Sequence, residues 1–109
     1  IVNITDFTFT VDGAENTTNS YTSSGNGIGY TSFKGIQLGY VIAPEDATDP
    51  VSVTWSSSNT KFITVDEKGL VELTTAGKLM KTNTAIISCS VKNTDGTTVT
   101  KSISITISR

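Results

Sequence analysis

Apolar side chains alternate with polar ones, mostly Ser and Thr, along much of this chain. The alternation is regular over residues 36–43, 84–92 and 99–108, and a shorter run covers Phe7–Val11. A period of two places successive side chains on opposite faces of an extended strand. The pattern therefore predicts half-buried β-strands in place of amphipathic helices.

Turn signals separate these stretches at short intervals. Pro44 follows the stretch 36–43, Gly69 separates two short apolar stretches, and Asp95-Gly96 lies between the last two long ones. Pro cannot donate to a ladder, Gly accepts a positive φ, and Asp-Gly favours a hairpin turn. About seven short strands divided in this way predict an all-β fold, an immunoglobulin-like Greek-key β-sandwich. One helical turn is expected near Lys78–Lys81.

The side chains expected in the core occupy the inward-facing positions of these strands. They are Leu38, Ile42, Trp55, Val65, Val71, Ile87, Cys89 and Ile105. Trp55 is the single Trp and is expected to anchor the core by contacting both sheets. Cys89 is the single Cys, so no disulfide can form within the chain, and its apolar face predicts a buried, inert thiol.

A long polar stretch, Ala14–Ser32, interrupts the alternation. It exceeds the usual connection of about 4–6 residues, so it is functional, disordered, or conceals a short strand near Tyr30–Phe33. Tyr21, Tyr30 and Phe33 lie in or beside it and are candidate contacts for a sugar or a protein, because aromatic rings give large contact area. Tyr30 and Phe33 could instead fold back onto the core, which leaves Tyr21 as the expected exposed anchor.

Length and charge narrow the class of protein. A chain of 109 residues fits a single domain, here taken as residues 1–109. The net charge of −2 and the scattered basic residues argue against nucleic-acid binding. No apolar run approaches the roughly 18–20 residues of a membrane span, so direct membrane insertion is not expected. The chain begins at Ile1, not Met, which indicates a domain excised from a larger chain.

Catalytic chemistry has little support in the residue types. The chain has no His, and its ten carboxylates are spread mostly over turns, so we expect neither an enzyme nor a cofactor. Glu45, Asp46 and Asp49 share one connection and are candidate calcium ligands, since calcium prefers several oxygen donors. The Pro-flanked turn explains these three carboxylates equally well.

One stretch carries a family resemblance. It runs Val53-Thr-Trp55-Ser-Ser, then Asn59, Val65-Asp66 and Gly69-Leu-Val71. This order resembles the signature of the bacterial immunoglobulin-like domain, group 2. A strand that ends in Pro44-Glu-Asp-Ala47 before the Trp is also similar to that family. The resemblance covers about residues 36–109, and the extra residues 76–83 depart from the family pattern.

The resemblance implies a non-catalytic structural or adhesion module of a bacterial cell-surface protein, located outside the cell. Its implied partners are a protein or glycan on a cell surface, or neighbouring domains of the same chain. Two alternatives stay open. One is a displayed domain of a phage virion protein, on the capsid or a tail appendage, that aids host attachment. The other is a carbohydrate-binding module that uses the aromatic residues between 21 and 33.

Overall fold

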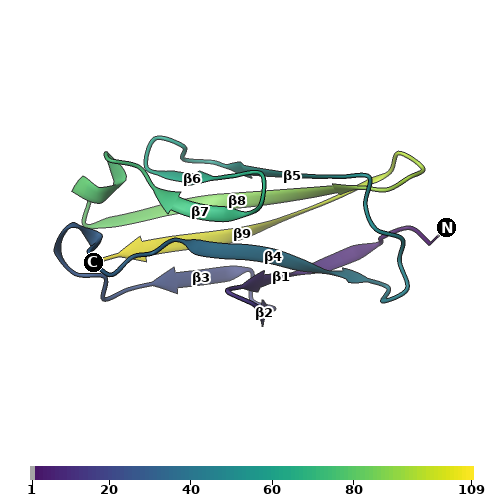
Figure 1. Ribbon diagram of the computed structural model, residues 1–109, viewed down its shortest axis with the longest axis horizontal. Helices are drawn as coiled ribbons and strands as arrows, with labels where there is room; N and C mark the ends of the chain where they lie inside the picture. Colours follow the sequence, from purple (N-terminus) through teal and green to yellow (C-terminus); the bar gives the residue numbers. More distant parts are fainter. Residues whose placement is uncertain (1) are drawn as a thin grey trace.

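The protein is a sandwich of two β-sheets, seen in a computed structural model that describes residues 2–109 (Figure 1). The five-stranded sheet has the order β2-β1-β4-β7-β6, and the four-stranded sheet has the order β3-β9-β8-β5. The first sheet comprises β1 (Asp6–Val11), β2 (Ala14–Asn16), β4 (Ile36–Ala43), β6 (Ile63–Val65) and β7 (Leu70–Leu73). The second comprises β3 (Ser20–Ser23), β5 (Ser52–Ser57), β8 (Thr82–Lys92) and β9 (Thr98–Ser108). The predicted all-β sandwich is confirmed.

The core is filled from both sheets by side chains at every second strand position. Phe7 and Phe9 of β1 pack edge to face, with ring centroids 5.4 Å apart, and both are buried. Of the residues expected in the core, five are buried: Leu38, Val71, Ile87, Cys89 and Ile105. The other three, Ile42, Trp55 and Val65, are half-buried and pack against that core.

Trp55 contacts both sheets but is less central than expected. Its ring lies 6.1 Å from that of Phe9 in the opposite sheet. Gly69 lies against the same indole, and its φ of 84° and its closeness to the carbonyl oxygen of Leu38 leave no room for a side chain. Trp55 is half-buried because β5 is the last strand of its sheet. The centre of the core is therefore formed by Phe7 and Phe9.

The longest pairing joins β8 and β9, which match residue for residue from Thr82↔Ser108 to Lys92↔Thr98. The Asp95-Gly96 turn that links them is where the sequence predicts it. Asn93 closes this end because its Oδ1 accepts from the Ile4 N–H at 2.8 Å while its Nδ2 donates to the Ile4 carbonyl at 3.0 Å. The hairpin thereby holds the N-terminal segment.

The stretch Ala14–Ser32 is structured, so it is neither a disordered segment nor a plain loop, and its contact with a partner stays a prediction. It forms β2, β3 and a short 3₁₀ turn, η1 (Ile28–Tyr30). β3 pairs in parallel with β9, from Ser20↔Ser104 to Ser23↔Ile107. Asn26 is buried and donates from Nδ2 to the carbonyl of Ser108 at 2.7 Å. The stretch supplies the edge strand of the four-stranded sheet.

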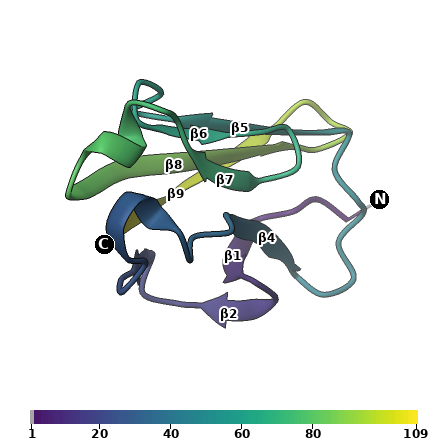
Figure 2. The same ribbon diagram turned by 60° about the vertical axis from the view of Figure 1, so that its left-hand side comes forward.

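The body is elongated, with principal extents of 49 × 23 × 17 Å. The long strands follow the longest axis, and the two ends of the chain lie at opposite ends of it (Figure 1). Figure 2 shows η1 beside the C-terminus. The expected helical turn is present as a second 3₁₀ turn, η2 (Gly77–Leu79).

Candidate functional site

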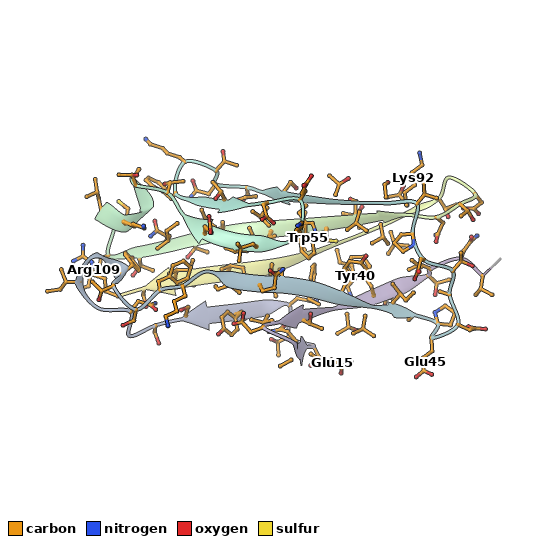
Figure 3. The ribbon with its side chains drawn as sticks, in the orientation of Figure 1. Glu15, Tyr40, Glu45, Trp55, Lys92 and Arg109 are labelled. Atoms are coloured by element: carbon orange, nitrogen blue, oxygen red, sulfur yellow. The ribbon has the colours of Figure 1, made fainter. Side chains whose placement is uncertain are left out.

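A groove of about 440 Å³ opens between β4 and the start of β5. It is lined by Tyr40 and Ile42 of β4 and by residues 49–53 of the connection into β5. Figure 3 shows Tyr40 between the two sheets, toward the end of the molecule where Glu45 and Lys92 lie. Both β4 side chains are half-buried and pack against the core, so the floor of the groove is apolar.

The groove exists because β7 pairs with only the first part of β4. The pairs are Ile36↔Val71 and Gln37↔Leu70, after which the chain turns at Gly69. The last contact on this side is the Leu38 N–H donating to the Gly69 carbonyl at 2.9 Å. Within residues 2–109, no strand pairs with this side of β4 beyond that contact.

The register with β1 shows which backbone groups are left free there. The carbonyls of Gln37 and Ala43 accept from Asp12 and Thr5, on the β1 side of the strand. Successive residues of a strand direct their N–H and C=O groups to opposite sides. The backbone groups of Tyr40 and Ile42 therefore face the open side, which is the arrangement that accepts an added strand.

The electrostatics of the groove favour binding over acid–base chemistry. Burial raises the pKa of Tyr40, and the negative charges that Cys89 and Asp49 carry when ionised raise it further. The phenol therefore stays protonated at neutral pH and can donate a hydrogen bond. Of the residues that line the groove, Asp49 carries the charge, and its side chain is exposed to solvent.

The candidate calcium ligands do not form a site in the structure. Glu45, Asp46 and Asp49 are all exposed on the β4–β5 connection. Across residues 2–109, no three or more His, Cys, Asp or Glu side chains are grouped so that they could hold a metal ion. The chain passes from β4 to β5 in a turn that places these carboxylates toward solvent.

The aromatic residues expected to contact a partner are turned toward the protein. Tyr30 is 3% exposed, and its hydroxyl donates to the Met80 carbonyl at 2.6 Å, so it cannot serve as a contact. Phe33 is half-buried against the core. Tyr21 lies on β3 opposite Ile105 and is half-buried against the core, so it is less exposed than expected, and its contact with a partner stays a prediction. None of the aromatic side chains in the described chain is fully exposed.

Three buried asparagines were not anticipated from the sequence. Asn26, Asn83 and Asn93 are 6%, 3% and 3% exposed. Asn83 donates from Nδ2 to the Gly77 carbonyl at 2.9 Å, which ties η2 to the start of β8. The sequence does contain a signal for the burial of Asn83. It stands two residues before Ala85 and four before Ile87, so it lies on the same inward-facing side of β8 as these apolar residues.

Cys89 is expected to be unreactive in the folded protein. Burial raises the pKa of its thiol to about 12, and the thiolate is the reactive form. At pH 9.0, the ordinary pKa of a Cys thiol, a maleimide should label Cys89 far more slowly than a Thr54→Cys thiol on the exposed face of β5. Equal labelling rates would contradict the buried position.

The raised pKa of Cys89 also predicts how stability depends on pH. Because the folded state holds the thiol proton more tightly than the ordinary pKa of 9.0 implies, the free energy of unfolding should fall as the pH rises from 9 toward 12.

The fold is an immunoglobulin-like sandwich. Its two sheets consist mainly of antiparallel strands, with the long β8–β9 hairpin in one sheet, and Trp55 contacts Phe9 of the opposite sheet. Residues 29–101 match the bacterial Ig-like domain (group 2) family, and the chain belongs to this family. The family is non-catalytic, and its domains usually occur in extracellular or surface proteins. No curated protein matches the chain in sequence. Within residues 2–109, no helix has the length and apolar character to cross a membrane.

Proposed function

We propose that this domain is a structural or adhesion module of a bacterial cell-surface protein and lies outside the cell. The observation that carries the proposal is the position of the chain ends, at opposite ends of a body 49 Å long (Figure 1). Segments joined to these ends would be held apart by the length of the sandwich. Family membership supports the same role, since domains of this family are typically structural or adhesion modules.

The groove beside β4 supplies a contact surface for such a module. An extended protein segment on a cell surface could pair with the free backbone groups of Tyr40 and Ile42. Its side chains would meet the apolar floor, and the Tyr40 hydroxyl could donate to it. Neighbouring domains of the same chain are the other expected partners.

An antibody raised against the domain tests the proposed location. Intact, unpermeabilised cells of the source organism should be labelled, whereas an antibody against a cytoplasmic protein should label them only after permeabilisation. If domain labelling also requires permeabilisation, the proposal is wrong. Label carried by released phage particles and absent from cells would support a displayed virion domain. Specific binding on a glycan array would support the carbohydrate-binding alternative.

A further inference from the structure

Basic residues gather at the end of the molecule where the chain finishes. Five of the eight in the chain lie there: Lys34, Lys61, Lys78, Lys81 and Arg109. The Arg109 N–H donates to the Lys81 carbonyl. Lys34 and Lys78 line one small pocket of about 240 Å³, together with Glu72, the acidic residue among its lining. The Lys61 carbonyl accepts from the Thr74 hydroxyl, just before η2. We call this end the basic pole, and Figure 3 shows Arg109 on it.

The basic pole also exposes apolar side chains. Ile28 of η1 is 85% exposed and Leu79 of η2 is 77% exposed, the two highest values among the large apolar residues of the described chain. The two turns are tied together by the hydrogen bond from Tyr30 to Met80, itself 42% exposed. Apolar side chains grouped among charges are typical of a surface that another surface covers.

The opposite end carries the complementary charge. Glu45, Asp46, Asp49 and Asp95 lie on the two connections there, with Lys92 as the cation. The connections meet at the N-terminal segment, where Thr48 donates to the Val2 carbonyl at 2.7 Å and Asn3 donates to Asp95 at 2.7 Å. Hydrogen bonds from Thr97 lower the pKa of Asp95, so this carboxylate stays ionised at neutral pH. We call this end the acidic pole.

The acidic pole has an apolar component too. Val51 is 64% exposed and Val2 is 38% exposed. The nearby Asp6 is paired with Lys101 at 3.2 Å, so this pair adds no net charge. Each pole thus presents apolar side chains among charges of one dominant sign, and the two signs are opposite.

We propose that the basic pole is a docking surface for the acidic pole of a second copy of this domain, placed end to end with the first. Lysines around Ile28 and Leu79 would face the carboxylates around Val51 of the next copy. Complementary charge sets the orientation and excludes contacts between like poles. The proposal rests on the proposed structural role, and it names the partner and the contact for that role.

The size of the poles determines how the contact must be tested. A cross-section of 23 × 17 Å limits the contact to a few hundred Å² per copy, on the order of half the roughly 800 Å² per partner of a standard interface. Separate copies would therefore associate weakly. Joining two copies in one chain raises the effective concentration of the poles to about the millimolar range, where such a contact forms.

The test is a chain of two copies joined by a Gly-Ser linker of about 12 residues, whose root-mean-square span of about 20 Å does not impose contact. NMR relaxation reports whether the copies tumble together or separately. At about 0.01 M salt, where charges act over about 30 Å, the copies should tumble as one body. At about 1 M salt, where the range falls to about 3 Å, the tumbling time should fall toward that of a single domain.

Charge-reversed variants identify the surfaces. Lys78→Glu with Lys81→Glu in the first copy should free the two domains at low salt. Glu45→Lys with Asp46→Lys in the second copy should restore joint tumbling when combined with that first pair. Lys68→Glu is the matched control and should change nothing, because Lys68 lies in the β6–β7 turn, near the middle of the long axis and away from both poles (Figure 1). Thermal unfolding of each single domain checks that the exposed substitutions leave the fold intact.

Several results would overturn the proposal. Independent tumbling at low salt, or joint tumbling that ignores both salt and charge reversal, means that the poles do not dock. If the Lys78→Glu and Lys81→Glu pair frees the domains and the Glu45→Lys and Asp46→Lys pair does not restore joint tumbling, the lysines do not face these carboxylates. Sedimentation with phosphatidylcholine–phosphatidylglycerol vesicles, together with independent tumbling, would assign the basic pole to an anionic membrane surface. None of these outcomes depends on where the domain is located in the organism, so the proposed function is tested separately.

Discussion

Phe9→Ala should lower the free energy of unfolding by about 3–5 kcal/mol, the usual cost of removing a large buried aromatic ring. Phe9 is fully buried on β1, and its ring contacts Phe7 beside it and Trp55 across the sandwich. Alanine would leave a cavity where the two sheets meet. Since a small domain is stable by about 5–15 kcal/mol, the variant should be marginal or unfolded.

Urea unfolding followed by circular dichroism measures this change, because Trp55 fluorescence itself would respond to the loss of Phe9. Val41→Ala is the matched control, since Val41 is 45% exposed on the neighbouring strand β4. It should change the free energy of unfolding by less than about 0.5 kcal/mol. Equal costs for the two variants would mean that the contact between the sheets is not centred on Phe9.

Replacing Ala14–Ser32 by a short Gly-Ser turn should cost at least about 3 kcal/mol and can abolish cooperative unfolding. The replacement removes the parallel pairing of β3 with β9, the Asn26 bond to Ser108 and the buried ring of Tyr30. A connection that served only as a loop could be shortened at little cost, because loop-closure entropy varies slowly with length. Calorimetry of the shortened domain gives the result.

Two further variants isolate the cause. Tyr30→Ala alone should show a large part of the loss, since Tyr30 caps the core. Substituting the exposed Thr17 and Thr18 by Gly and Ser leaves β3 and η1 in place and should be nearly neutral. A shortened domain with the stability of the full chain would show that β3 is dispensable.

The strands that could be predicted are those whose signal is local. Alternation alone locates β4 at Ile36–Ala43 and places the ends of β8 and β9 within two residues. Pro44, Gly69 and Asp95-Gly96 mark turns because their backbone preferences act wherever they stand. β3 has no such signal. The residues Ser20–Ser23 are almost all polar, and they form a strand because β9, more than eighty positions away, offers a free edge.

The groove could be predicted only in part, for a similar reason. Alternation places Tyr40 and Ile42 on the inward face of β4, as the structure has them. Whether that face is covered depends on where β7 stops pairing, which is a property of two strands and not of either one. The expected calcium site failed for a related reason. The carboxylates of residues 45–49 are close in sequence, but the fold does not group them so that they could hold a metal ion.

The direction of the strands has a mechanical consequence. A pull on the two chain ends acts along the 49 Å axis, which is also the direction of the long strands (Figure 1). Tension at Arg109 is carried by β9, which is held by eleven residue pairs with β8 and four with β3. Tension at the other end is carried by β1, held by six pairs with β4 and three with β2. These ladders are loaded in shear, so their hydrogen bonds must yield together and not one after another, and β1, with the shorter ladder, is the strand that should slip first.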